Sequence, residues 1–442
     1  MLFKRLLSVE RAQEILLDNV TEIRQEEQIP THNALHRVAA TDIYATMDLP
    51  PFDRATMDGF AVRSLDIVGA SETKPVRLRL VGHIKAGKFP RTILIGGMAT
   101  RVDTGSVIPK GADAVVPIEY CEEDNGYVLV YRSVGFGENI QWAGSDIMRG
   151  ELLIQKGTLL SSRHIGALVG CGINHISAKR RPKVAVFSIG DELVTVGKEL
   201  EFGQIYDINI HTISSLVKMC YAEPVVLGTA RDNVDSIISM IAHGLKVADI
   251  VVSTGGSSVG QFDFIRRAIE TLESKLLFHG VMSKPGKPVL AAKINNKLYI
   301  GLPGNPTSAI ISFLLYVKPI IFKLCGCRLD SRDIHTTQIY RPEYGVKGRR
   351  LYKTVVLKRS KDKLLYEPLS PSSESISTLS KASGFFVIPE NVEKLDAGEI
   401  VNVNVFEPPQ YADLIVVGEF SPTLLRIIAD TANMHSMRVT YI

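Results

Sequence analysis

The sequence has little of what marks a membrane, secreted or nucleic-acid-binding protein. Its longest apolar stretches, such as residues 310–317 and 248–253, are far shorter than the roughly 20 residues that cross a bilayer. The 51 basic and 47 acidic residues leave a net charge of only +4, which is too small an excess to indicate nucleic-acid binding. The N-terminus has no signal-peptide core. We therefore expect a cytoplasmic protein with neither a membrane nor a nucleic acid as a partner.

Cysteine is also scarce. Five cysteines are scattered over 442 residues, which does not make a disulfide framework, so we expect free thiols in a reducing compartment. Cys325 and Cys327 are one residue apart, a tight spacing for two metal ligands, and no second pair follows them. We interpret them as ordinary thiols.

The length and the changes of pattern along the chain predict several domains. A single hydrophobic core rarely extends over 442 residues. Residues 8–20 have helical spacing, with Ser8 as the candidate cap, and residues 51–144 consist of short alternating segments between turns, which is typical of β structure. The predicted divisions are a mixed domain of residues 1–50 with 145–182, a β-rich insert of 51–144, an α/β domain of 183–328, a β domain of 329–408 and a tail of 409–442.

From Lys183 the pattern becomes strand, loop and helix in alternation. Residues 184–188 read as a buried strand, and helices are expected at 210–220 and 233–244 between further strands. This alternation predicts a mostly parallel sheet with helices on both faces, an αβα sandwich. In such sheets a ligand binds beyond the carboxyl ends of the strands.

Four loops at the predicted strand ends carry candidate binding groups. Residues 188–192 end in two acids, and Gly255, Gly256, Ser257 and Ser258 offer backbone N–H groups and hydroxyls to an anion. Lys284 and Lys287 stand on a proline-stiffened segment, and Pro303, Gly304, Asn305 and Pro306 precede a helix that we expect to extend to Tyr316. Each loop alone also has a structural explanation, in which an acid or Asn305 simply caps a helix. Together they predict an anion-binding crevice with carboxylates that can hold a divalent cation.

These motifs, in their order, resemble the MoeA family and the related gephyrin E domain. The matching segments are residues 50–62 (PPFDRATMDGFAV), 104–115 (TGSVIPKGADAV), 188–193 (SIGDEL), 203–209 (GQIYDIN), 231–233 (RDN), 253–260 (STGGSSVG), 284–288 (KPGKP) and 301–309 (GLPGNPTSA). The resemblance extends from about residue 8 to 408. It implies an α/β multidomain protein: an αβα sandwich of the molybdopterin-binding type, a β-rich insert, a mixed N-terminal domain and a C-terminal β-barrel-like domain.

The resemblance also implies an activity. Members insert molybdenum from molybdate into adenylylated molybdopterin and release AMP, with the help of Mg²⁺. The expected partners are a second copy in a homodimer, a molybdopterin adenylyltransferase and molybdoenzyme acceptors. By motif, the catalytic positions are Asp58, Thr104, Asp146, Glu192, Asp232 and Asp263, and Asp58 and Asp146 would come from the insert of the facing subunit. The substrate positions are Gly255, Gly256, Ser257, Ser258, Lys284, Lys287, Pro303, Gly304, Asn305 and Pro306. Glu192, Asp207 and Asp232 are the candidate metal ligands, although Asp232 is equally a candidate helix cap and Asp58 a candidate turn residue.

Four positions depart from the family pattern. Trp142 lies where arginines usually precede Asp146, and Gln261 replaces an acid. Gly280 stands where many members have lysine, and Thr354 replaces an arginine. These changes make the predicted crevice less charged than is usual in the family.

Three alternatives to the transferase follow from the sequence. One is a paralogue that binds the pterin nucleotide or handles tungstate, with little or no transfer. Another is a gephyrin-like scaffold, for which the chain offers no linker or partner domain. The third is nucleic-acid binding through residues 347–363, where lysines alternate with apolar residues as on the solvated face of a strand. The tail is predicted as strand, helix and strand, too short for a core of its own; it either packs on the β domain or is a remnant of a domain fused to some members.

Overall fold

The computed structural model describes residues 6–256, 262–327, 334–339, 341–360, 363–369, 376–406, 411–418 and 421–441. The chain divides into two compact units, one of Met1–Gln25 with Arg180–Ile442 and one of Glu26–Lys179. Residues 1–25 thus belong with the α/β region, whereas residues 26–50 belong to the second unit. Each unit is described by itself.

A six-stranded mixed sheet is the centre of the first unit. Its order is β16 (Glu223–Ala230), β13 (Lys183–Ile189), β17 (Ile250–Gly255), β21 (Lys297–Leu302), β20 (Leu290–Ile294) and β18 (Lys275–His279). The first four strands are parallel, and β20 and β18 continue the sheet in antiparallel pairing. The predicted mostly parallel sheet is therefore confirmed, with the antiparallel strands β20 and β18 together at one edge. The strand order reverses at β13, so β16 and β17 lie on either side of it, which is the position where such sheets bind ligands.

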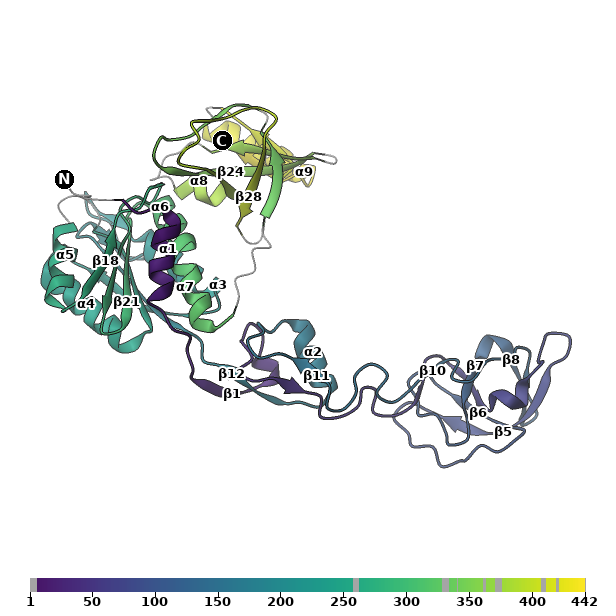
Figure 1. Cartoon of the computed structure of the whole chain (residues 1–442). Helices are drawn as coiled ribbons and strands as arrows, with labels where there is room; N and C mark the ends of the chain where they lie inside the picture. Colours follow the sequence, from purple (N-terminus) through teal and green to yellow (C-terminus); the bar gives the residue numbers. More distant parts are fainter. Residues whose placement is uncertain are drawn as a thin grey trace. The chain divides into compact units, whose positions relative to one another are not determined.

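Helices cover both faces of this sheet. The helices are α1 (Val9–Asp18), α3 (Ile208–Met219), α4 (Val234–Val247), α5 (Phe262–Thr271), α6 (Pro306–Ser312) and α7 (Lys318–Cys325). Figure 1 shows α4 and α5 on one side of the sheet and α1, α3 and α7 on the other. The predicted cap of α1 is confirmed, because the Ser8 hydroxyl accepts from the Arg11 N–H at 3.2 Å.

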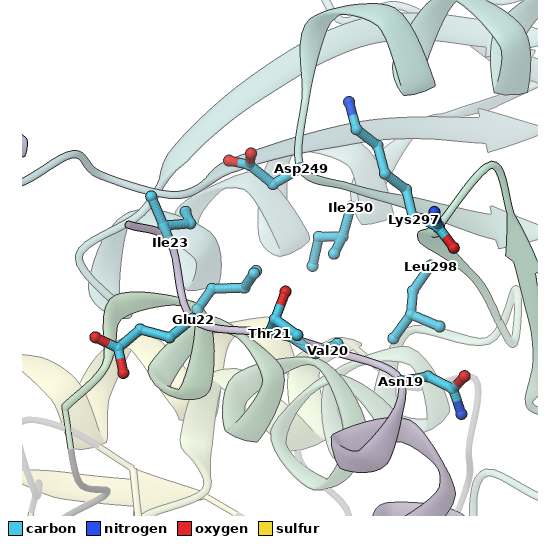
Figure 2. Close-up of a pocket in the computed structure, with 11 residues that line it drawn as sticks. Asn19, Val20, Thr21, Glu22, Ile23, Asp249, Ile250, Lys297 and Leu298 are labelled. Atoms are coloured by element: carbon cyan, nitrogen blue, oxygen red, sulfur yellow. The ribbon is translucent and has the colours of Figure 1, made fainter. Parts of the chain in front are cut away.

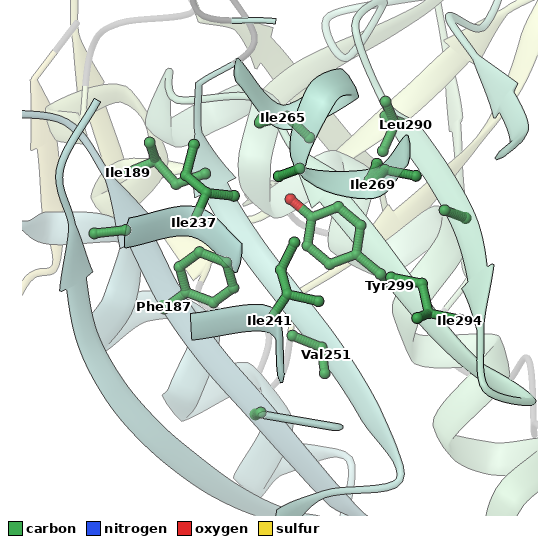
Figure 3. Close-up of a cluster of buried hydrophobic side chains, with 14 of the residues drawn as sticks. Phe187, Ile189, Ile237, Ile241, Val251, Ile265, Ile269, Leu290, Ile294 and Tyr299 are labelled. Atoms are coloured by element: carbon green, nitrogen blue, oxygen red, sulfur yellow. The ribbon is translucent and has the colours of Figure 1, made fainter. Parts of the chain in front are cut away.

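The core of the sheet domain follows from strands that are buried on both faces. Six of the seven residues of β13 are buried, which is expected of a parallel strand between two helix layers. Phe187 and Tyr299 are fully buried among isoleucines of α4 and α5, such as Ile237, Ile241 and Ile265 (Figure 3). Burying a side chain of this size contributes roughly 1.5–3 kcal/mol, so this cluster holds α4 and α5 on the sheet.

The helix after residue 305 is longer than predicted. It does not end at Tyr316 but continues from Pro306 to Cys325 through a π-helical segment, η4 (Phe313–Val317). Among the described residues it is the one helix long and apolar enough to cross a membrane, but 61% of its most apolar window is buried inside the structure. That burial is typical of a core helix.

A second sheet follows in the same unit. It has seven strands: β19 (Ser283–Lys284), β24 (Arg350–Ser360), β26 (Gly384–Ile388), β28 (Ile400–Val405) and β22 (Ile334–Gln338) in order, with β25 (Lys363–Pro368) and β29 (Tyr411–Ala412) also pairing with β24. Two short strands, β23 (Glu343–Tyr344) and β27 (Lys394–Leu395), and the helix α8 (Ile376–Lys381) complete the region. The Thr337 hydroxyl of β22 donates to the Leu364 carbonyl of β25 at 2.7 Å, so β22 at one end of the strand order approaches β25, which pairs with β24.

Residues 350–360 of the basic run form β24, but this strand is not the solvated face that the sequence suggested, because Tyr352, Thr354 and Val356 on its other face are also buried. Leu351, Val355 and Leu357 of β24 are buried. Lys353 pairs with the buried Glu343, and the exposed Lys347 lies 3.4 Å from Glu393. These lysines take part in ion pairs of the sheet.

The tail forms the predicted strand, helix and strand. These are β30 (Leu414–Val416), α9 (Pro422–Met434) and β31 (Val439–Tyr441), and β30 pairs with β31 in parallel. Ile415 packs against a buried cluster of the β domain that includes Val356 and Ala412. The tail therefore begins as a part of that domain.

The second unit contains a six-stranded β sheet and a smaller α/β part. The sheet order is β7 (Ala114–Pro117), β4 (Gly59–Val62), β6 (Met98–Val102), β5 (Val76–Ile84), β9 (Tyr127–Val130) and β8 (Cys121–Asp124). The smaller part has β1 (Glu26–Pro30) paired with β12 (His175–Lys179), β2 (Ile43–Tyr44) with β11 (Leu152–Ile154), and the helix α2 (Ser162–Gly170). The short strands β3 (Arg54–Ala55) and β10 (Ile140–Gln141) pair with each other and pack against the larger sheet. Residues 51–144 are β-rich, as predicted. The two cysteines of this unit, Cys121 and Cys171, are free thiols.

Candidate functional site

A pocket of about 620 Å³ lies at the carboxyl ends of β13 and β17. We call it the strand-end pocket. All four predicted loops contribute residues to its lining, the third of them through Pro288 alone. The ends of parallel strands meet at one edge of a sheet, which brings such loops together. Its lining residues are Ile189, Glu192, Leu193, Ile205, Tyr206, Asp207, Ile208, Asn209, Thr254, Gly255, Gly256, Pro288, Pro303, Gly304, Asn305, Pro306 and Ser308.

Gly255 is the last residue of β17, and close backbone contact explains why it is a glycine. A Cβ on Gly255 would lie 2.3 Å from the carbonyl oxygen of Ile189, and the backbone of Gly255 has a φ of +89°. Only glycine fits both conditions. Gly304 approaches the same point from the other side, since its Cβ position is 3.4 Å from the Cα of Gly255. The loops after β17 and β21 are thus packed against each other through glycines.

Two helices begin at the strand-end pocket. The α3 helix is capped by Asp207, whose Oδ1 accepts from the Ile210 N–H at 3.1 Å. The helix that starts at Pro306 has Asn305 at its N-cap position and proline in its first turn, as predicted, but the Asn305 side chain makes no capping hydrogen bond. The Asn209 amide donates to the carbonyl oxygen of Gly304 at 2.5 Å and joins the two helix starts.

The carboxylates of the pocket have different environments. Asp207 is buried, and its Oδ2 lies 3.4 Å from the Thr229 hydroxyl, so both of its oxygens are engaged. The Glu192 carboxylate folds over Gly190, where a Cβ would be 2.6 Å from Oε2. Within the described ranges, neither a hydrogen bond nor an ion pair engages the Glu192 carboxylate.

Within the residues that the structure describes, the candidate ligands Glu192, Asp207 and Asp232 do not come together as a cluster of three carboxylates. Within the described residues, no group of three histidine, cysteine, aspartate or glutamate side chains is close enough to hold a metal ion. Asp207 caps α3 instead, and Asp232 does not line the pocket. The Asp232 N–H lies 3.3 Å from the Asp191 carboxylate. Asp232 is not the cap of α4 either, because Asn233 occupies that position and accepts from the Ser236 N–H at 2.9 Å.

Several predicted residues lie outside the pocket lining. Lys284 is exposed and Lys287 is half-buried, and of their loop only Pro288 lines the pocket. Asp263 lies in the first turn of α5 and is exposed. Ser257 and Ser258 lie outside the described residues, as does Gln261. Of the predicted site residues, the strand-end pocket therefore brings together Glu192, Asp207, Gly255, Gly256 and residues 303–306. Lys284 and Lys287 do not line it.

Asp58 and Thr104 form a pair in the second unit. The Asp58 Oδ1 accepts from the Thr104 N–H at 2.6 Å and from its hydroxyl at 2.9 Å. These two hydrogen bonds, the backbone one first, hold the pKa of the exposed Asp58 below its usual value. Asp58 thus fixes a turn, as the simpler interpretation had it, and stays ionised. Asp146 is exposed in the same unit, and its N–H donates to the Leu49 carbonyl at 3.1 Å.

The unusual residues have local structural roles. The Trp142 ring stacks on Phe136 with 5.7 Å between centroids. Gly280 has a φ of +92°, a conformation that a lysine would adopt only with strain. Thr354 is buried in β24, and its carbonyl accepts from the Leu369 N–H at 2.9 Å.

A second pocket, of about 210 Å³, lies at the opposite edge of the sheet (Figure 2). The segment from Asn19 to Ile23 crosses the starts of β17 and β21 there. Its charged groups are used internally: the Lys297 ammonium donates to the carbonyls of Leu245 and Ala248, and Asp249 pairs with Arg180. We assign it no ligand.

The sequence motifs missed part of the pocket. Tyr206, Ile208 and Asn209 line it but were not predicted as site residues. They flank Asp207 within the GQIYDIN motif: Tyr206 ends β15 (Ile205–Tyr206), and Ile208 and Asn209 begin α3.

Known proteins match this chain along almost its whole length. Residues 7–172 match the MoeA N-terminal region (domain I and II), residues 185–323 a probable molybdopterin binding domain, and residues 345–406 the MoeA C-terminal region (domain IV).

Individual relatives cover most of the chain as well. The molybdopterin molybdenumtransferase of Bacillus subtilis is 32% identical over 393 residues, 86% of this chain and 89% of the relative. That of Staphylococcus epidermidis is 30% identical and covers 93% of this chain and 98% of its own length. A molybdopterin biosynthesis MoeA protein of Pyrococcus horikosii has a TM-score of 0.78 and 37% identity, with 91% and 100% of the two chains covered. The chain belongs to the molybdopterin molybdenumtransferase (MoeA) family of molybdenum cofactor biosynthesis.

Proposed function

We propose that this chain transfers molybdenum from molybdate into adenylylated molybdopterin and releases AMP and molybdenum cofactor. The observation that carries the proposal is the strand-end pocket, in which the glycine, proline and Glu192 motifs of the family meet at one edge of the sheet. The names of relatives that cover most of the chain support the same activity.

The pocket suits a substrate with phosphate groups. Gly255 and Gly256 line the pocket with backbone atoms alone, and an added Cβ at either position would collide with Ile189 or Ile265. Backbone N–H groups in such a loop can approach an anion closely. The helix that starts at Pro306 directs its first N–H groups toward the same space without a capping side chain. Such donors stabilise negative charge that develops on oxygen as a phosphoanhydride is cleaved.

Mg²⁺ is the divalent cation that we propose for the reaction. Glu192 fits it best, because its carboxylate lines the pocket and the oxygens of Asp207 are engaged in capping α3. When bound, Mg²⁺ would supply positive charge against the phosphate oxygens of the substrate. Glu192 would orient it, with the remaining ligands coming from substrate and water.

The anion partner and the assembly are further parts of the proposal. Lys284 and Lys287 would attract molybdate to the mouth of the pocket, and Asp58, Thr104 and Asp146 would act from a second copy in a homodimer. The product would pass to molybdoenzymes in the cytoplasm, and a molybdopterin adenylyltransferase would supply the substrate.

Reconstitution tests the activity directly. Purified protein is mixed with adenylylated molybdopterin, molybdate and Mg²⁺, and AMP is measured by chromatography over time. We expect one AMP released for each molybdenum cofactor formed, and no release without molybdate. Tight substrate binding without AMP release would contradict the proposal and favour a non-transferring paralogue, and tungstate in place of molybdate tests the choice of oxyanion.

A further inference from the structure

The strand-end pocket has one wall of a different chemical character. Its other walls are glycine and proline loops, whereas β15 (Ile205–Tyr206) and the start of α3 present Ile205, Tyr206 and Ile208. These side chains are 55%, 39% and 40% exposed although they are apolar or aromatic. Apolar side chains that face a concave site are the usual contacts of the uncharged part of a ligand.

This wall is held firmly in place. The strand pair β14 (Leu193–Val194) and β15 is anchored by hydrogen bonds from the Ile205 N–H to the Glu192 carbonyl at 2.9 Å and from the Asp207 N–H to the Val194 carbonyl at 3.0 Å. The Tyr206 hydroxyl donates to the Lys198 carbonyl at 2.9 Å. The phenol ring is therefore fixed at both ends, and its face does not need to be ordered when a ligand arrives.

Asp207 makes this side of the pocket less favourable for phosphate than the helix start at Pro306. Asp207 lies between Tyr206 and Ile208, caps α3 and brings a negative charge to that helix start. The 20-residue helix from Pro306 to Cys325 has no such side-chain cap, and Ser308 in its first turn lines the pocket. An elongated ligand with an anionic part and an uncharged part thus has a defined direction here.

We propose that Tyr206, flanked by Ile205 and Ile208, is a stacking platform for a planar heteroaromatic ring of the substrate. The ring lies against the β15 wall, and the phosphates point toward the helix start at Pro306. This inference rests on the proposed function and adds a subsite to it. Adenylylated molybdopterin has two such planar ring faces, the pyrimidine part of the pterin and the adenine, and either one has the π-face that the platform requires.

Binding measurements with ring-bearing and ringless probes test the platform. Calorimetry is done with AMP, 6-hydroxymethylpterin and inorganic pyrophosphate on the full chain and on Tyr206→Leu, Tyr206→Phe and Phe202→Leu. Phe202 is the matched control, because it is a fully exposed aromatic residue of the same loop that does not line the pocket. We expect Tyr206→Leu to weaken one ring-bearing probe by about tenfold. Tyr206→Phe keeps the ring and should retain most of the affinity, and Phe202→Leu should change nothing.

Pyrophosphate separates stacking from a general loss of the fold. Its affinity should be the same in all four proteins, because it has no ring. Weakening of AMP alone assigns the platform to adenine, and weakening of the pterin alone assigns it to the pterin. Unchanged affinity of both rings in Tyr206→Leu would overturn the proposal, as would equal weakening of pyrophosphate or wild-type protein that binds neither ring. AMP release by the wild-type protein reports on the transferase activity separately, so the two proposals can fail independently.

Discussion

The Asn209 side chain of α3 donates a hydrogen bond to the carbonyl oxygen of Gly304, 95 residues further along the chain, at 2.5 Å. Both residues line the strand-end pocket. The bond therefore ties the apolar wall to the proline loop and sets the distance between them. A change in this bond should affect the pocket more than it affects the fold.

Asn209→Asp should reduce turnover while leaving stability nearly intact. The carboxylate cannot donate and would repel the Gly304 carbonyl, and a typical hydrogen bond of this kind contributes about 1 kcal/mol. We expect kcat/KM for AMP release to fall by about tenfold and Tm to fall by only a few degrees. Asn19→Asp is the matched control, because the Asn19 amide also donates to a backbone carbonyl, that of Ile15 at 2.8 Å, outside this pocket. Equal losses of kcat/KM in both variants would contradict the role of the Asn209 bond.

Replacing each carboxylate by the corresponding amide distinguishes the role of Asp207 from that of Glu192. Because asparagine caps a helix about as well as aspartate, Asp207→Asn should retain stability, whereas Asp207→Ala should lose about 1 kcal/mol of unfolding free energy. Glu192→Gln should raise the Mg²⁺ concentration at half-maximal rate by about tenfold or more, with little change in Tm. Denaturant unfolding and Mg²⁺ titrations of AMP release measure the two effects. If Asp207→Asn shifts the Mg²⁺ dependence as far as Glu192→Gln does, Asp207 is a ligand after all.

The sequence predicted the sheet edge and its loops well, because these features are local. The buried run of β13 and the glycines after β17 are readable from consecutive residues, and their meeting follows from the parallel pairing. The role of Asp207 could not be predicted from the sequence. Its position in the motif suggested a metal ligand, but whether its oxygens are engaged depends on the Ile210 N–H and on Thr229 of a different strand.

The prediction that the helix ends at Tyr316 was wrong for a related reason. Pro319 removes a backbone donor and normally ends or kinks a helix. Here the π-helical segment Phe313–Val317 shifts the pairing just before it, so the proline falls in the first turn of α7 and the helix continues to Cys325. The packing of Ile320 and Ile321 in the core stabilises this continuation, and such tertiary packing cannot be read from the segment alone.

Thr104 should control the ionisation of Asp58. Thr104→Val removes the hydroxyl donor and keeps the backbone N–H, so the pKa of Asp58 should rise toward its usual value while staying below it. Since the pKa of Asp58 in the folded state is lowered, its contribution to stability is present above the unfolded pKa of about 3.9 and is lost as pH falls through the folded one. A ¹³C NMR titration of the Asp58 carboxyl group measures the pKa, and Thr104→Ser should leave it unchanged. An identical pKa in Thr104→Val would show that the hydroxyl has no influence.

Lys284→Ala should weaken the dependence on molybdate without destabilising the protein. The side chain is exposed, so removing it leaves no buried group unpaired. If its ammonium attracts the oxyanion, the molybdate KM rises by about tenfold and depends less on ionic strength. Lys275→Ala, also an exposed lysine on a strand of this unit, is the control. An unchanged molybdate KM in Lys284→Ala would refute its assignment to anion binding.

Alanine substitutions at Gly255 and Gly304 test how closely the end of β17 packs against the end of β13 and against the loop after β21. Gly255→Ala would place a Cβ 2.3 Å from the Ile189 carbonyl oxygen at a φ of +89°, so the backbone must shift and β17 must move from β13. Gly304→Ala would place its Cβ 3.4 Å from the Gly255 Cα, an ordinary contact. We expect Gly255→Ala to lower the unfolding free energy by more than about 2 kcal/mol and to lose AMP binding, while Gly304→Ala stays within about 1 kcal/mol of wild type. Denaturant unfolding and calorimetry with AMP measure both. Equal stability of the two variants would mean that β13 and β17 are further apart at their ends than the Ile189–Gly255 pairing places them.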